Sequence, residues 1–227
     1  GEGQQAYPVL GGAAVYRICK NGGVSYSNRE GDNEHLYDNG ICSGCGVYEV
    51  PAYINDCYQI ANKGNLYWFA GLVNGDASVC TGGVTQNTSA RAVLTQDITV
   101  NTGVLDNEGT LASDTTGFIS WTPIGNLINN EHIMYTGTFD GKGHTISGLY
   151  FAGSTSSNFR LGFFGYVGRG GSVSNVGIVD SYFSGGTYVG GVCGDNYGTI
   201  KNCYYAGAVS GTNVGGVCGY NRGSGNI

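Results

Sequence analysis

The strongest constraint on the fold is a short Gly-rich motif that returns along the C-terminal part of the chain. The hexapeptide VGGVCG at residues 189–194 recurs unchanged at 214–219, 25 positions later. A looser copy, LGFFG at 161–165, ends 29 residues before Gly194. The segment GSVSN at 171–175 likewise matches GTIKN at 198–202, 27 positions on. Copies at intervals of 25–29 residues indicate an internal structural repeat.

A period of this length favours stacked strands over other repeat architectures. The regular Leu/Asn pattern of leucine-rich repeats is missing, and a propeller blade needs about 40 residues. In a parallel stack each repeat pairs with the next at about 4.8 Å, and equivalent side chains such as Val192 and Val217 form a ladder in a narrow core. Glycine makes up 43 of the 227 residues, which suits tight turns and disfavours helix-rich folds.

Upstream of the repeats, strands and one helix are expected. Residues 92–100, 135–139 and 144–151 have the pattern of strands, and residues 65–74 have apolar side chains at helical spacing. Asn65 is the expected N-cap of this helix, and Gly75 lies just past its end. A helix in front of the first repeat is well placed to cover the open end of a solenoid. We therefore divide the chain into an N-terminal module (1–50), a linker with the capping helix (51–90) and a β-helix (91–227).

Several motifs in this order resemble the repeat region of bacterial GLUG-motif surface proteins. They are LYWFAGLVN, LTQDITV, YTGTFDGKGHTISGLYF and VGGVCGDNYGTIKNC, and the resemblance covers roughly residues 57–227. It implies an all-β protein with a right-handed parallel β-helix, here of about five rungs, in a secreted or wall-attached bacterial protein. Some members of the group are adhesin-like and others sit beside IgA-directed metallopeptidase domains, but the group supplies no active site.

The N-terminal module contains a candidate metal site. Cys42 and Cys45 form a C-x-x-C knuckle of the kind that zinc sites use, and a segment of about 50 residues with little apolar content needs such a staple. The segment HLYDNGICSGCG at 35–46 resembles short zinc-ribbon-like repeats of secreted clostridial proteins. This resemblance implies zinc ligands at His35, Cys42 and Cys45, with Cys19 as the fourth. Cys19 lies 16 positions before His35, which departs from the pattern, so disulfides and unlinked thiols stay open as alternatives.

The remaining cysteines are expected to be structural. Cys57 and Cys80 flank the helix and are placed to pair. Cys193 and Cys218 are equivalent in successive repeats, where side chains lie about 4.8 Å apart, whereas a disulfide brings Cβ atoms to about 3.8 Å. We therefore expect buried, unlinked thiols at both positions.

Charge and motif content exclude several classes of function. The net charge is −6 and the ten basic residues are spread thinly, which excludes a nucleic-acid partner. No apolar run approaches the roughly 18 residues of a membrane span. Pectinase-type hydrolysis requires clustered aspartates, and Asp140 and Asp180 are isolated in the sequence. A polysaccharide-active enzyme is therefore disfavoured, and we expect no catalytic residues.

These observations predict a non-catalytic extracellular surface module for adhesion or ligand binding. Its expected partner is a host or matrix glycan or protein, and the alternative is a structural stalk in a larger surface protein. The last repeat stops in mid-rung at Ile227, so we expect the parent chain to continue with further rungs or another domain.

Overall fold

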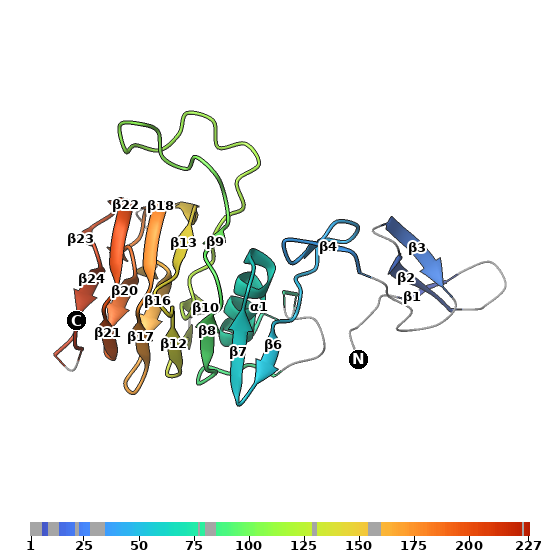
Figure 1. Cartoon of the computed structure of the whole chain (residues 1–227), viewed down its shortest axis with the longest axis horizontal. Coiled ribbons are helices and arrows are strands. Elements are labelled where there is room, and N and C mark those ends of the chain that lie inside the picture. Colours follow the sequence, from blue (N-terminus) through green and yellow to red (C-terminus); the bar gives the residue numbers. More distant parts are fainter. Residues whose placement is uncertain are drawn as a thin grey trace.

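The computed structural model describes residues 6–8, 14–20, 23–27, 35–76, 78–79, 85–128, 131–153, 160–223 and 225–227. In these residues the chain is mostly strand with one helix, and most strand pairs are parallel. Figure 1 shows the strands from β7 onward side by side along the long axis of the molecule, with the helix α1 beside the first of them. The prediction that the chain consists mainly of strands is therefore confirmed.

The N-terminal strands are antiparallel. The first sheet has the order β1-β2-β3, with β1 (Ala6–Pro8), β2 (Ala14–Lys20) and β3 (Gly23–Ser27). A separate hairpin joins β4 (Tyr37–Asp38) to β5 (Ile41–Cys42).

The largest sheet has six strands in the order β21-β17-β12-β8-β7-β6. Its strands are β6 (Ala52–Ile54), β7 (Cys57–Ile60), β8 (Ala92–Leu94), β12 (Thr138–Asp140), β17 (Ser172–Ser174) and β21 (Thr199–Lys201). Only the β6–β7 hairpin is antiparallel, and every later pair is parallel. The parallel ladder thus begins at Tyr58, inside the segment that the sequence assigned to a linker.

Three further parallel sheets share the same stacking direction. One contains β9 (Ile98–Thr99), β13 (Thr145–Ser147), β14 (Tyr150–Ala152), β18 (Gly177–Ser184) and β22 (Tyr204–Ser210). The second contains β15 (Arg160–Leu161), β19 (Tyr188–Gly190) and β23 (Asn213–Gly215), and the third β16 (Phe164–Val167), β20 (Cys193–Asn196) and β24 (Cys218–Asn221). A small antiparallel hairpin, β10 (Leu127–Ile128) with β11 (Glu131–His132), lies outside these sheets.

The two VGGVCG copies lie in register. Val189 pairs with Val214 and Cys193 pairs with Cys218, each across 25 positions. The Val192 N–H donates to the carbonyl of Val217 at 3.0 Å, and Val192 is completely buried. The predicted equivalence of these positions is confirmed.

Side-chain ladders reinforce the backbone pairing at the turns. Asn175 and Asn202 both have left-handed backbones, with φ of 54° and 53°, at equivalent positions of two repeats. The Asn202 amide donates to Asn175 Oδ1 at 3.1 Å, and the Asn175 amide donates to Asp140 Oδ1 at 2.9 Å. Asparagine tolerates this conformation better than most residues, which explains its recurrence here.

The helix α1 (Lys63–Asn74) is buried from Gly64 to Asn74. Phe69 lies 6.2 Å from Tyr135 and 6.2 Å from Phe139 between ring centroids, so the helix joins the core between the sheets. The C-terminal prediction is confirmed, because Gly75 has the left-handed φ of 72°. The N-terminal prediction was wrong: Asn62, not Asn65, is the N-cap, and its side chain accepts from the Asn65 N–H.

The strands predicted at 92–100 and 144–151 are each divided in two. In the second, Gly148 breaks the run with a φ of 79°, and a Cβ at this position would clash with the backbone of Asn101. The division places β13 and β14 one after the other along β18, so each predicted long strand forms two short ones.

Candidate metal centre

The knuckle of the candidate site begins with a tight hairpin. Asn39 and Gly40 connect β4 to β5, and both have positive φ, 48° and 77°. Two such residues form the Asn-Gly turn whose twist matches antiparallel strands. The second turn is closed by the Gly46 N–H, which donates to the Cys42 carbonyl at 2.8 Å. The sequence NGICSGCG therefore folds back on itself and brings Cys42 and Cys45 together.

The hairpin is anchored to the start of α1. The Gly64 N–H donates to the Asn39 carbonyl at 3.2 Å, and the Asn62 amide donates to the Glu49 carboxylate at 2.7 Å. A Cβ on Gly40 would overlap the Asn62 side chain and approach the Gly64 backbone. The absence of a side chain at Gly40 and Gly64 thus allows the knuckle and the helix to meet.

The structure brings all four predicted ligands together. The ligand atoms of Cys19, His35, Cys42 and Cys45 all lie within 4.8 Å of one another. The Cys19 and Cys42 sulfurs are 3.2 Å apart, and Cys45 Sγ is 3.4 Å from His35 Nδ1. Cys19 reaches the group from β2, although it is distant in sequence. Both Cys19 and Cys42 are buried, with 3% and 2% of their surface exposed.

Of the three neighbouring thiols, only Cys42 has a lowered pKa. Burial, reinforced by the neighbouring thiols, raises the pKa of Cys19 to about 12. Burial also opposes ionisation of Cys42, but the Cys45 N–H and the His35 side chain stabilise its thiolate and lower its pKa to about 6. Burial raises the pKa of Cys45 as well. A bound cation would allow the other two thiols to ionise, because thiolates are the form that ligates metals.

The donor set fits a tetrahedral metal ion. Zn–S bonds of about 2.3 Å and Zn–N bonds of about 2.0–2.1 Å place neighbouring ligand atoms roughly 3.5–3.8 Å apart. The observed separations of 3.2 and 3.4 Å are near this spacing and well above the roughly 2.0 Å of a disulfide bond. The cluster can therefore hold a metal ion. With four protein ligands no coordination position would stay open, so the centre would be structural.

The remaining described cysteines lie outside the candidate metal centre. Cys57, Cys193, Cys203 and Cys218 are unlinked, and Cys193 is completely buried beside Cys218. The prediction of unlinked thiols at Cys193 and Cys218 is thus confirmed, whereas the predicted burial holds for Cys193 and not for Cys218, which is half-buried. The suggested pairing of Cys57 with Cys80 falls outside the described residues, because Cys80 is not among them.

One charged cluster was not singled out by the sequence. Asp195 is completely buried on β20 and accepts two hydrogen bonds from Arg222, both at 2.9 Å. Arg160 Nε lies 3.8 Å from the same carboxylate, and Tyr188 and Tyr220 stack over the guanidinium groups. Residues 195 and 222 lie 27 positions apart, which is close to the repeat period. This spacing is the feature of the sequence that could have suggested the ion pair.

The comparisons with known proteins give partial matches. No model of a known protein family matches the chain, and no solved structure matches it. Halomucin of Haloquadratum walsbyi is 34% identical over 109 residues, which are 48% of this chain and 1% of halomucin. A protein of Evansella cellulosilytica described as a Gly-rich membrane protein is 34% identical over 85 residues, 36% of this chain and 9% of that protein. The chain therefore spans a small fraction of the length of either relative.

Proposed function

We propose that this chain is a non-catalytic module of an extracellular surface protein, used for adhesion or ligand binding. Its repeat region would be a right-handed parallel β-helix of about five rungs that presents side chains along its sides. The observation that carries this proposal is the parallel register between successive repeats, in which Val189 pairs with Val214 and Ile178 with Tyr205. Right-handed winding is expected, since parallel crossovers are almost always right-handed.

The similar proteins support a surface location. The two relatives are named halomucin and a Gly-rich membrane protein, and the matched segments lie within much longer chains. The resemblance to GLUG-motif surface proteins points the same way. In the described part of the chain, no helix is long and apolar enough to cross a membrane.

The bonding of the aspartates supports a non-catalytic role. Asp195 is neutralised by Arg222, Asp140 pairs with Lys142 at 2.9 Å, and Asp180 accepts from the Leu105 N–H at 3.0 Å. Asp106 and Asp114 each accept backbone N–H groups of their own turns. Carboxylates with such structural duties are poor candidates for the paired acid and base of a glycosidase.

We further propose that the metal is zinc and that it cross-links the module of residues 1–50, whose hairpin packs against the start of the helix in the 51–90 segment. Three cysteines and one histidine are a common structural zinc donor set. The ligand atoms lie in a module whose described side chains include few large buried apolar groups, so a metal would supply stability that a small core lacks. The β-helix of residues 91–227 would then be the third part of the chain.

Binding of the intact chain to immobilised ligands tests the main proposal. Mucin, a neutral glycan array and matrix proteins would be presented on a biosensor, with heat-denatured protein and an unrelated acidic protein as controls. Saturable binding to one ligand class is expected. The rival function is a stalk, favoured by the continuous ladder of backbone and asparagine bonds along the stack. Folded protein that binds none of the surfaces would contradict adhesion and favour the stalk.

A further inference from the structure

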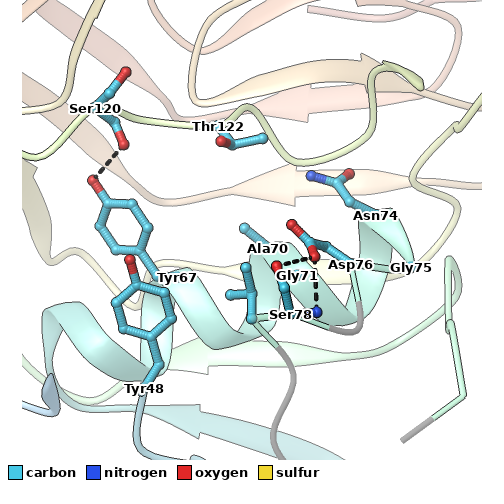
Figure 2. Close-up of a pocket in the computed structure, with 11 residues that line it drawn as sticks. Tyr48, Tyr67, Ala70, Gly71, Asn74, Gly75, Asp76, Ser78, Ser120 and Thr122 are labelled. Atoms are coloured by element: carbon cyan, nitrogen blue, oxygen red, sulfur yellow. Dashed lines mark hydrogen bonds between the residues drawn. The ribbon is translucent and has the colours of Figure 1, made fainter. Parts of the chain in front are cut away.

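A pocket of about 450 Å³ opens beside the C-terminal half of α1. Figure 2 shows it between the rings of Tyr48 and Tyr67 on one side and Asp76 with Ser78 on the other. The segment that carries Ser120 and Thr122 also lines it. This volume is within the range of about 300–1,000 Å³ typical of small-molecule sites.

The walls of the pocket are held in place by buried contacts. The Asn74 amide donates to the Pro123 carbonyl at 3.0 Å, and Asn74 Oδ1 accepts from the Gly125 N–H at 2.8 Å. These two bonds tie the end of α1 to the 120–125 segment. Asn74 is 5% exposed, so the tie is shielded from water. This wall of the pocket is therefore already in place without a ligand, which lowers the entropic cost of binding.

One wall is an aromatic surface. The Tyr48 and Tyr67 rings are stacked, with centroids 5.2 Å apart and planes 27° from parallel. The Tyr67 hydroxyl donates to the carbonyls of Ile119 and Ser120 at 3.3 and 3.2 Å, which fixes its ring. Tyr48 lies on this fixed ring and is half-buried. The half-buried ring of Tyr48 therefore gives the pocket an aromatic wall.

The opposite wall is polar and carries one negative charge. Asp76 Oδ1 accepts from the Ser78 N–H at 2.9 Å and from the Ser78 hydroxyl at 2.6 Å, so the exposed carboxylate is oriented. Burial, together with the charge of Asp76, raises the pKa of Tyr48, which keeps the tyrosine hydroxyl protonated as a donor. Of the described residues that line the pocket, Asp76 is the one with a charge.

We propose that this pocket binds a neutral sugar ring, with one face of the ring on Tyr48 and its hydroxyl groups on Asp76, Ser120 and Thr122. A pyranose has an apolar face and a rim of hydroxyls, which matches the aromatic and polar walls. An anionic ligand is disfavoured by the Asp76 carboxylate and by the lack of a cation among the described lining residues. A quaternary ammonium ion prefers a cage of several aromatic faces, whereas Tyr67 is only 6% exposed and Tyr48 is the more exposed of the two lining rings. The assignment deepens the adhesion proposal and rests on it for its biological role.

The direct test is saturation-transfer NMR on the intact chain with methyl glycosides of glucose, galactose, mannose and N-acetylglucosamine. Tetramethylammonium is the probe for the rival cation site. We expect transfer to at least one glycoside, with a Kd on the order of millimolar for a single ring, and none to tetramethylammonium. Absence of transfer to all four glycosides would overturn the assignment, and transfer to tetramethylammonium instead would favour the cation site.

Point variants locate the site. Asp76→Asn should weaken binding about fivefold, because a charge-assisted hydrogen bond becomes a neutral one. The turn should survive, since Asn87 Oδ1 accepts the same pair of bonds from the Ser89 N–H and hydroxyl, at 3.1 and 3.0 Å. Asp114→Asn is the matched control, because Asp114 accepts from the Thr116 N–H at 2.9 Å in an exposed turn outside the pocket.

Tyr48→Leu keeps an apolar contact with Tyr67 and removes the ring, and we expect a loss of at least tenfold in affinity for the glycoside. Glycoside binding that is unchanged in both Asp76→Asn and Tyr48→Leu would overturn the assignment. Mucin binding that persists in both variants would leave adhesion standing without this pocket. Sugar binding without attachment to mucin, glycans or matrix proteins would contradict adhesion alone.

Discussion

Replacing Arg222 by methionine should destabilise the chain by about 3 kcal/mol, because it leaves the carboxylate of Asp195 buried with a weaker partner. Asp195 is completely buried, and Arg222 holds both of its oxygens at 2.9 Å. Removing one partner of a buried ion pair costs about 3–5 kcal/mol. Arg160, with Nε 3.8 Å from the carboxylate, offsets part of this cost. The Arg222 side chain is 30% exposed, so solvent also moderates the effect.

Neutralising the stranded carboxylate should restore part of the stability. The double variant Arg222→Met with Asp195→Asn buries an amide in place of an anion, and a buried amide costs only about 1–3 kcal/mol when unpaired. We therefore expect the double variant to be about 1–2 kcal/mol more stable than Arg222→Met alone. Arg169→Met is the matched control, because Arg169 is exposed and its replacement should change stability by less than about 0.5 kcal/mol.

Urea unfolding followed by circular dichroism and by tyrosine and tryptophan fluorescence measures these differences. In a thermal melt, about 3 kcal/mol corresponds to a fall in Tm of roughly 6–12 °C for a chain of this size. Coincident transitions by the probes would show that the two-state treatment holds. If Arg222→Met unfolds like the parent protein, or if Asp195→Asn gives no recovery in its background, the buried-charge reasoning fails.

Three further predictions concern the thiols and the hairpin. Purified protein should contain about one zinc ion per chain by mass spectrometry. Cys45→Ser should release the zinc while the repeat region keeps its circular dichroism spectrum. Metal-free protein with disulfides would contradict this prediction. Gly40→Ala should lower the Tm more than Gly46→Ala, because both have φ near 78° but only Gly40 lacks space for a Cβ. Between pH 7 and 9 iodoacetamide should modify Cys218 faster than Cys193. A hydrogen bond from Cys193 lowers the pKa of Cys218, whereas burial raises the pKa of Cys193. Equal rates of modification would contradict this reasoning.

The parts of the fold that follow from local pattern were predictable. Identical hexapeptides can pair in parallel only if they occupy equivalent positions, so the register of Val189 with Val214 was readable from the sequence. The knuckle of Cys42 and Cys45 was equally readable, because the Asn-Gly turn and the short spacing act within a few residues. The position of Cys19 beside the knuckle was suggested by the resemblance to zinc-ribbon-like repeats and not by spacing, because it depends on how β2 lies against the knuckle.

The failures have a common physical cause, which is close contact between segments distant in sequence. Gly64 has low helix propensity and precedes the predicted helix, yet it lies inside α1, where the carbonyl of Gly40 leaves no room for a side chain. The helix therefore begins at Lys63 and not after Asn65. Gly148 likewise divides a predicted strand because the backbone of Asn101 passes beside it. Such contacts cannot be read from the periodicity of apolar residues in the sequence.

The irregular spacing of the paired strands leaves extra residues, and some of them line the pocket that we propose as a sugar site. Along the six-stranded sheet Phe139 pairs with Ala92, 47 positions earlier, whereas Ile200 pairs with Val173, 27 positions earlier. Pairing requires equal geometry only in the strands, so extra residues leave the stack, as in the segment between β9 and β10 that rises from it (Figure 1). Asp180, at a register shift of β18, reaches this segment and accepts the Leu105 N–H. The far end of the same segment returns at Ser120 and Thr122, which line the proposed sugar pocket. A regular ladder with such an excursion can carry binding residues outside the stacked core, which fits the adhesion function that we propose.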